Sequence, residues 1–431
     1  MDNVDLSKKT VCIVDTGLAL HMAPLLAKTF GRVLYHLPDS DAYRKTNRAR
    51  IGTGIPNVER VKRLFDVVQV DQTNRIVDLF IFPDACMVDT QKHLRALGYP
   101  VVGCFDSDII ELNKEFFYQQ LQSLGLPVAP YEIAIGIDDL RDKLDVREDW
   151  PAIIKLKNQE FRGITETFPC YDADGIDPTL DDIACILGRD QFLTEFLIQD
   201  CIPSTCEIGF DALQQGCEIA DNPIVGIEGK DEWYIARVVP KLPPMLQEYM
   251  DKTAPIMGML GLCGHRSTEN RITDEGVSFG IDETIRVPSP PGELFPELYM
   301  DGDYAQAMWA LGQGQVPSLR VKARCGVQLI LTSSSLDDGM PVKVSFPPEI
   351  APYVKLKNWM MEEDGSVWVI PNDNDYYLGA VVAVGASIEE AAAKVKEYAS
   401  QIKAHKLFYE DDVLLCSADA RAKAATFGVV I

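Results

Sequence analysis

Residues 264–292, "GHRSTENRITDEGVSFGIDETIRVPSPPG", place charged side chains where strands usually carry apolar ones. The run "TDEG" lies between two short segments of strand character and predicts a hairpin turn. Glu269 lies on the first arm, and Asp282, Thr284 and Arg286 lie on the second. Because alternate residues of a strand share a face, these last three side chains are expected to point the same way. The hairpin therefore gathers two acids, a hydroxyl and a guanidinium.

Length and composition indicate a folded protein of several domains. The chain has 431 residues, of which 47% are hydrophobic, and this length predicts about two to four domains. No run reaches the roughly 18 apolar residues of a membrane span, so no membrane segment is expected. The N-terminus "MDNVDLSKKTVCIVDTG" is acidic and enters a strand, so we expect no signal peptide and a cytoplasmic location. The 11 cysteines contain no CxxC pair, which favours reduced thiols.

The net charge limits the classes of partner. A formal charge of −24 argues against general nucleic-acid binding, which needs a basic surface that displaces counterions. It does not exclude a nucleotide, because a few local lysines and a divalent cation can hold a triphosphate.

The first quarter of the chain has an α/β pattern. Short apolar segments that predict strands alternate with a helical stretch that ends at Gly31; the segments are residues 9–15, 32–38, 77–84 and 99–105. Such alternation predicts a parallel sheet covered by helices. No GxGxxG follows the first strand, so a dinucleotide site is not expected. We assign residues 1–111 to an N-terminal α/β domain.

The middle of the chain mixes strands and helices. Residues 112–134 predict an amphipathic helix that stops at Gly125, and residues 150–168 predict a strand, a polar loop with Gly163 and a return strand. Residues 190–213 predict a further pair of strands. Residues 379–404 predict a strand, a serine-capped turn and a long helix. Domain boundaries are expected near residues 112 and 322.

Chemically suggestive side chains follow one another through this middle part. They are, in chain order, Lys114, Lys155, Glu195, Glu207, Glu269, Asp282, Thr284 and Arg286. Each alone is more often a solvated surface residue. Their order and surroundings resemble the ATP-grasp superfamily: Lys114 precedes "GLPVAP", Lys155 ends "PAIIK", "FLTEFLI" and "CEIGFD" carry the two glutamates, and "IDETIR" ends the series.

The resemblance implies an α/β and α+β protein with three units. These are an N-terminal α/β domain (1–111), an ATP-grasp domain (112–321) with a mobile lid at about 128–195, and a C-terminal α+β domain (322–431).

The resemblance also implies a role for each residue of the series. Lys114, Lys155 and the loop of Gly163 would hold the phosphates of ATP. Glu195 would lie beside the adenine and Glu207 beside the ribose. Mg²⁺ (or Mn²⁺) would be bound by Glu269, Asp282 and Thr284. Arg286 would be catalytic, since a planar set of donors can stabilise a transferring phosphate. Thr284 departs from the asparagine usual in the family and is a weaker metal ligand.

The tail, residues 378–413, is similar to the C-terminal domain of the phosphoribosylamine–glycine ligase family, but the glycine-rich opening of that family is absent from "CIVDTGLALH". The resemblance implies an ATP-dependent ligase that joins a small-molecule carboxylate to an amine through an acyl phosphate and releases ADP and phosphate, as a monomer or homodimer. Three alternatives stay open: a true phosphoribosylamine–glycine ligase, a phosphotransferase of the same fold, and a nucleotide-binding protein without turnover. Arg237, Lys241 and Arg266 are candidates for the substrate pocket.

Overall fold

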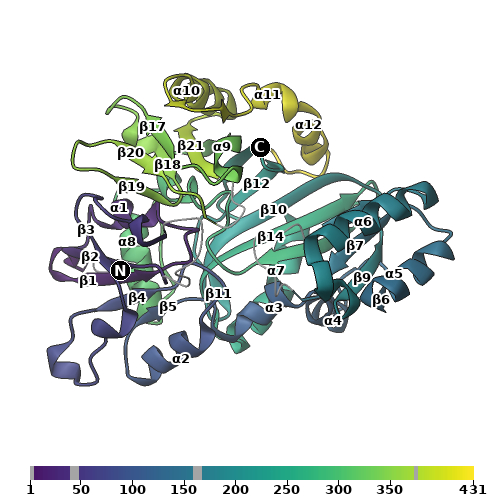
Figure 1. Ribbon diagram of the computed structural model, residues 1–431, viewed down its shortest axis with the longest axis horizontal. Coiled ribbons are helices and arrows are strands. Elements are labelled where there is room, and N and C mark those ends of the chain that lie inside the picture. Colours follow the sequence, from purple (N-terminus) through teal and green to yellow (C-terminus); the bar gives the residue numbers. More distant parts are fainter. Residues whose placement is uncertain (1–3, 39–47, 159–166, 373–376) are drawn as a thin grey trace.

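The computed structural model describes residues 4–38, 48–158, 167–372 and 377–431. Its N-terminal part forms one side of the molecule, a small helix-covered unit projects from the opposite side, and a large sheet lies between them (Figure 1). The C-terminal helices lie above the large sheet in this view.

The N-terminal sheet is parallel, with the strand order β3-β2-β1-β4-β5. Its strands are β1 (Thr10–Val14), β2 (Arg32–His36), β3 (Val58–Val61), β4 (Leu79–Ile81) and β5 (Val101–Val102). The apolar run of β1 is buried throughout, as expected for a strand covered on both faces. The predicted parallel sheet is confirmed, whereas β3 was not expected. The expected helix before Gly31 is shorter, because α1 spans only Met22–Leu26.

Helices surround this sheet. They are α1, α2 (Val88–Ala96) and, from much later in the chain, α8 (Asp303–Gly312), which packs against β4 and β5. The side chains of Tyr304, Met308 and Leu311 on α8 join the N-terminal core. One face of the N-terminal sheet is thus completed by a distant segment.

The projecting unit has a separate core. An antiparallel sheet of order β6-β9-β7-β8 is covered by α5 and α6. The bounds are β6 (Tyr131–Ile135), α5 (Gly136–Asp145), β7 (Ala152–Leu156), β8 (Thr167–Cys170), α6 (Ile176–Leu187) and β9 (Glu195–Asp200). Helices α3 (Asp108–Leu112) and α4 (Lys114–Ser123) connect this unit to the N-terminal sheet. Gly125 follows α4 with a φ of 65°, so the predicted helix ends where a glycine is favoured.

The large sheet is antiparallel and has ten strands along the path β15-β14-β10-β12-β13-β16-β21-β18, with β11 beside β10 and β23 beside β16. Its strands are β10 (Ser204–Gln215), β11 (Glu218–Ile219), β12 (Ile224–Gly229), β13 (Trp233–Val238), β14 (Cys263–Thr273), β15 (Ser278–Thr284), β16 (Cys325–Ser333), β18 (Val354–Leu356), β21 (Tyr377–Gly385) and β23 (Leu407–Phe408). The boundary predicted near residue 322 falls between β15 and β16, and the sheet continues across it. The division into domains stays a prediction.

A four-stranded sheet of order β19-β20-β17-β22 completes the C-terminal part. Its strands are β17 (Val342–Ser345), β19 (Trp359–Met361), β20 (Val367–Val369) and β22 (Lys403–Ala404). The remaining helices are α7 (Pro244–Met259), α9 (Ser334–Asp337), α10 (Ile388–Ser400), α11 (Val413–Cys416) and α12 (Ala418–Thr426). The Ser387 hydroxyl accepts a hydrogen bond from the Glu390 N–H, so the predicted serine cap of α10 is confirmed.

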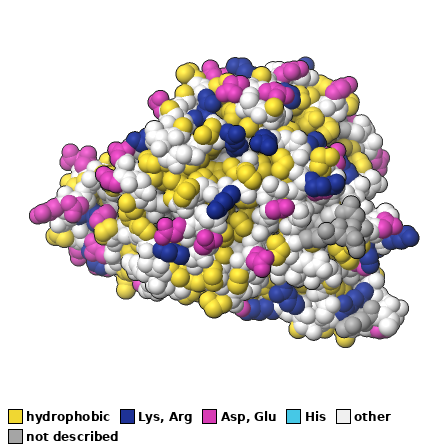
Figure 2. Space-filling view, turned by 180° about the vertical axis from the view of Figure 1, so that it is seen from behind, with side chains coloured by type: hydrophobic (Ala, Val, Ile, Leu, Met, Phe, Trp, Pro, Cys, Tyr) yellow, Lys and Arg dark blue, Asp and Glu magenta, His cyan; other side chains and the backbone are white. Residues whose placement is uncertain are grey.

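Other sequence predictions concern the surface and the cysteines. Within the described ranges, no helix is long and apolar enough to cross a membrane. All 11 cysteines are free thiols, as expected. On the face shown in Figure 2, lysine and arginine side chains are scattered among acidic ones rather than joined into a broad basic surface.

Candidate functional site

The acidic hairpin is formed by β14 and β15. The turn is closed by a hydrogen bond in which the Thr273 N–H donates to the Val277 carbonyl at 3.0 Å. Within this turn, Gly276 has a φ of 81°. This backbone conformation suits glycine and explains the "DEG" of the turn. Glu269 lies directly opposite Asp282 in the strand register. The hairpin thus holds the two carboxylates on facing strands.

A β-bulge lies next to this acidic pair. Glu269 pairs with Asp282, but the next residue, Asn270, pairs with Gly280, so Ile281 is the extra residue. Its carbonyl accepts hydrogen bonds from Lys155 Nζ and Tyr118 Oη, both at 3.3 Å. Lys155 Nζ also donates to Tyr118 Oη at 2.9 Å. The bulge therefore holds the lysine of β7 beside the acids.

Lys114 reaches the hairpin from α4. The Asn113 side chain caps this helix by accepting from the Phe116 N–H at 2.8 Å, so Lys114 is the first helical residue. Its buried ammonium forms an ion pair with Asp282. Burial alone would raise the pKa of Asp282, but Lys114 and Lys155 outweigh burial and hold that pKa below its usual range. Asp282 is therefore ionised.

Glu269 has the opposite character. Burial raises its pKa to about 7, and the charges of Asp282 and Glu207 act in the same direction against the two lysines. The pKa of Glu228 on β12 is raised well above its usual value, first by loss of solvation of the carboxyl and then by the charges of Glu269 and Glu207, although the residue keeps solvent access at the end of its strand. Four acids thus act on one another at this end of the sheet, and added positive charge would relieve their repulsion.

Glu228 was missed by the sequence analysis. It stands in "IVGIEGKDE", where a carboxylate follows a run of apolar residues at the end of a buried strand. That signal is weak, since strand ends commonly carry acids. Only the pairing of β12 beside β10 brings Glu228 to the acidic hairpin.

The reverse face of the hairpin is locked by a buried ion pair. The side chains of Arg266 and Glu283 are 0% exposed, and Arg266 Nε and Nη2 donate to the two carboxylate oxygens at 3.0 and 2.6 Å. Arg266 also donates to Gln214 Oε1 at 3.2 Å and Thr253 Oγ1 at 2.5 Å. Arg266, considered above for a substrate pocket, is therefore fully engaged in structure. Arg237, the second such candidate, donates to the Val430 carbonyl at 3.1 Å.

Arg286 lies on the side of the hairpin that faces the N-terminal domain. Its Nε donates to Glu111 Oε1 at 2.7 Å and lies 3.8 Å from Asp84 Oδ1. The other oxygen of Glu111 accepts from the Ile285 N–H at 3.0 Å. Thr284 ends β15 opposite Ser267. The orientation of the Arg286 side chain is thus set by Glu111 and Asp84, two acids that the sequence analysis did not select.

Asp84 connects Arg286 to the ends of the parallel strands. Asp84 follows β4 and accepts from Thr16 Oγ1 at 2.6 Å, and Thr16 follows β1. The strand order places β1 next to β4, with β2 and β5 outside them. The chain reverses its direction of winding between these two central strands. Ligands of open parallel sheets bind at this point, beyond the carboxyl ends of the strands.

Glu195 and Glu207 have other partners. Lys157 Nζ lies 3.1 Å from Glu195 Oε1 and 2.8 Å from Glu115 Oε2. Glu207 accepts from Arg271 Nε at 2.9 Å. Lys157 follows directly after β7 and was not selected from the sequence, although "KLK" places both lysines on one face if the extended chain continues by one residue. Gly163 lies outside the described residues.

The predicted residues therefore form three neighbouring groups. Lys114, Lys155, Glu269 and Asp282 act on one another at the bulge. Glu195 lies beside this group with Lys157, and Arg286 lies with the acids of the N-terminal side. Over the described ranges, no three side chains of histidine, cysteine, aspartate or glutamate are arranged to hold a metal ion by themselves.

The fold is shared with several solved enzymes. The phosphoribosylamine–glycine ligase of Thermotoga maritima matches with a TM-score of 0.68 at 16% identity, over 94% of this chain and 99% of that chain. The biotin carboxylase domain of the Hydrogenobacter thermophilus 2-oxoglutarate carboxylase, in complex with MgADP, ADP and bicarbonate, matches with a TM-score of 0.65 at 11% identity, over 96% and 98%. The L-amino acid ligase of Bacillus licheniformis matches with a TM-score of 0.59 at 15% identity, over 94% and 99%.

Comparison by sequence gives no match, whereas comparison by structure does. No protein-family model and no curated protein matches the sequence. The structural matches extend over nearly the full length of each chain. The expected fold class is thereby confirmed, and the chain has the ATP-grasp fold.

Proposed function

We propose that this protein is an ATP-dependent carbon–nitrogen ligase that joins a carboxylate to an amine through an acyl phosphate, with release of ADP and phosphate. The observation that carries the proposal is the group at the bulge, in which Lys114 and Lys155 lie beside the facing acids Asp282 and Glu269. An ATP phosphate chain needs cations around it, and paired acids need a cation between them. The same few residues can meet both needs once Mg²⁺–ATP is present.

The donor set fits Mg²⁺. This ion takes oxygen ligands and usually binds through one or two carboxylates together with phosphate oxygens and water. Asp282 and Glu269 would hold it, with Thr284 as a hydroxyl ligand, and the ion would neutralise phosphate charge. Two protein carboxylates are enough in such a site, so it requires no cluster of three acids. Burial and the charges of Asp282 and Glu207 raise the pKa of Glu269 to about 7, and a cation bound beside this carboxyl would lower that pKa.

Each remaining side chain then has a role of its own. Lys114 and Lys155 would exchange their present contacts for phosphate oxygens, and the pair of Lys157 and Glu195 would lie on the adenine side. Glu207 would meet the ribose, and the loop of Gly163 would cover the phosphates. Arg286 would stabilise charge on the transferred phosphoryl group, since a guanidinium binds phosphate oxygens with two parallel hydrogen bonds.

The acceptor substrate would lie toward the N-terminal sheet. Arg286 faces Asp84, and Asp84 is bound to Thr16 at the ends of two central parallel strands. We infer that the carboxylate substrate binds beside Arg286, on this side of the hairpin. In that place, a bound carboxylate would have the nucleotide phosphates on one side and the amine substrate on the other.

Phosphoryl transfer to an alcohol would use the same nucleotide residues. Hydroxylamine separates the two reactions, because it intercepts an acyl phosphate as a hydroxamate and leaves an alkyl phosphate unchanged. The test is ADP formation over a panel of carboxylates and amines, with hydroxylamine replacing the amine. Hydroxamate formed in proportion to ADP supports the ligase, whereas ADP formed with a phosphorylated alcohol and no hydroxamate overturns it.

Variants connect this test to the site. Arg286→Lys keeps the charge but removes the planar pair of donors, so carboxylate-dependent ADP formation should fall by about tenfold or more while ATP binding is retained. Arg32→Lys is the matched control, because Arg32 is an exposed arginine of the N-terminal sheet that binds Glu59 and belongs to no proposed site. Equal losses in the two variants would contradict the role of Arg286.

A further inference from the structure

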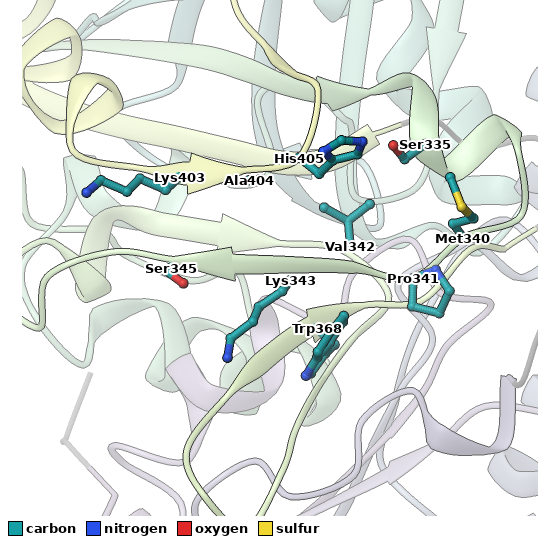
Figure 3. Close-up of a pocket in the computed structure, with 10 residues that line it drawn as sticks. All are labelled: Ser335, Met340, Pro341, Val342, Lys343, Ser345, Trp368, Lys403, Ala404 and His405. Carbon is teal, nitrogen blue, oxygen red and sulfur yellow. The ribbon is translucent and has the colours of Figure 1, made fainter.

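A second polar site lies in the C-terminal part, away from the acidic hairpin. A cavity of about 500 Å³ opens on the four-stranded sheet and is lined by Ser335, Met340, Pro341, Val342, Lys343, Ser345, Trp368, Lys403, Ala404 and His405. Figure 3 shows that most of these side chains come from the neighbouring strands β20, β17 and β22, whereas Ser335 lies on α9 and Met340 and Pro341 lie in the segment before β17. The volume lies within the range of small-molecule sites.

The strand register explains why these side chains share one face. Lys343 on β17 lies opposite Trp368 on β20, and Ser345 lies opposite Lys403 on β22. Val342 and Val344 alternate with them and are buried in the core beneath. The outer face therefore carries an indole, two ammonium groups and a hydroxyl across three strands.

The charge of the cavity is opposite to that of the protein. The chain carries a formal net charge of −24, yet the lining contains two lysines and a histidine and no carboxylate. In the described part of the chain, no ion pair joins Lys343 or Lys403 to an acid, and Lys406 nearby is paired with Asp338 at 3.3 Å. Hydrogen bonds from Ser366 lower the pKa of Asp364, and the charge of Lys343 adds to them, so an acid lies near Lys343 outside the lining. The lining itself holds two lysines and no acid, which favours a bound anion.

Aromatic and hydroxyl groups complete the site. Lys343 Nζ lies 6.0 Å from the centre of the Trp368 ring, so charge and ring face the same region. Ser335 is 1% exposed, and its Oγ has no hydrogen-bond partner among the residues that the structure describes. A buried hydroxyl without a partner is costly to the fold, and a ligand that bonded to it would remove the penalty.

We propose that this cavity binds a small phosphorylated compound with a flat ring, of the size of a nucleoside monophosphate. Lys343 and Lys403 bind the phosphate, the indole of Trp368 stacks on the ring, and the Ser335 hydroxyl bonds to a polar group of the ligand. The site is separate from the hairpin and does not depend on the function proposed above.

The probes are AMP, CMP, adenosine and inorganic phosphate, titrated calorimetrically into the full chain. AMP and CMP should bind, and adenosine or phosphate alone should bind at least about tenfold more weakly, since each lacks one half of the recognition. The Lys343→Gln, Lys403→Gln double variant should weaken the binding of AMP by about tenfold or more. Trp368→Leu should weaken AMP binding to a similar extent, because the stacking contact is lost.

Two controls make the result specific. Lys406→Gln removes a neighbouring lysine outside the cavity and should change AMP affinity by less than about twofold. Lys155→Ala changes the hairpin site and should leave AMP binding at the second site intact. The proposal is overturned if neither mononucleotide binds at about 1 mM. CMP decides between the two sites, because the hairpin site is proposed to bind an adenine nucleotide. The proposal is also overturned if CMP binding survives the double lysine variant or disappears in Lys155→Ala.

Discussion

The buried ion pair behind the acidic hairpin gives a prediction whose size follows from the structure. Glu283 accepts two hydrogen bonds from Arg266, and both side chains are fully buried. Glu283→Gln retains the shape but leaves the guanidinium charge without its counterion. Removing one partner of a buried pair lowers the free energy of unfolding by about 3–5 kcal/mol. Such a loss is a large share of the roughly 5–15 kcal/mol that stabilises a typical domain.

The assay is urea unfolding of the parent and the variant, followed by far-UV circular dichroism. Glu275→Gln is the matched control, because Glu275 is an exposed acid in the turn of the same hairpin. Its effect should stay within about 0.5 kcal/mol. A loss for Glu283→Gln that is no larger than the control would refute the reasoning.

A double variant tests whether the loss comes from the unpaired charge. Arg266→Met combined with Glu283→Leu removes both charges and fills the space with apolar atoms. Replacing a whole buried pair in this way is often nearly neutral. The double variant should therefore be more stable than either single variant, and losses that simply add would contradict the buried-pair account.

Three further predictions concern pH, the metal and the nucleotide. Burial raises the pKa of Asp211 to about 7 against the hydrogen bonds from Ser267 and Tyr234, so the folded state keeps a proton that the unfolded chain releases near pH 4. Relative to Asp211→Asn, the melting temperature of the parent should fall as the pH rises from about 4 to about 7 and then level off, and identical pH profiles would contradict this. Thr284→Asn should tighten Mg²⁺ binding in the presence of an ATP analogue, measured by calorimetry, because an amide oxygen is the stronger ligand; unchanged or weaker binding would exclude residue 284 from the metal site. Lys155→Ala should remove most of the rise in melting temperature that Mg²⁺–ATP produces, and a full rise in the variant would show that Lys155 does not meet the nucleotide.

The sequence predicted the hairpin well because its signals are local. The turn glycine, the alternation of polar and apolar residues and the opposing positions of Glu269 and Asp282 all lie within one short segment. The serine cap of α10 was predictable for the same reason. Local chemistry of this kind is readable without knowledge of the tertiary fold.

Long-range contacts could not be predicted in this way. Glu111 accepts a hydrogen bond from the Ile285 N–H, and the two residues are 174 positions apart in the sequence. Asp84 lies near Arg286 only because β4 ends beside the hairpin. The bulge at Ile281 depends on the pairing of β15 with β14 and has no signature in the residues themselves. Likewise, α8 covers the N-terminal sheet through packing that periodicity cannot assign to a partner.

Candidate substrate residues were the least predictable part. Arg266 is a cation in an acidic hairpin, as expected of a binding residue. Its side chain nevertheless faces the core. The alternation of faces on β14 separates Arg266 from Glu269, which is three residues away. A one-residue change of register exchanges the two faces, so charge pattern alone does not separate a structural arginine from a binding one.

The central claim, that the hairpin holds Mg²⁺–ATP, is tested most directly by a magnesium titration of ATP-analogue binding to the parent and to Asp282→Asn. Asp282 accepts from the buried Lys114 and faces Glu269, so its replacement removes one carboxylate at the point where metal and phosphate would meet. We expect Mg²⁺ to tighten analogue binding by the parent and to have an effect at least about tenfold smaller in the variant, with Glu275→Gln unchanged. The same response to magnesium in the parent and in Asp282→Asn would contradict the account.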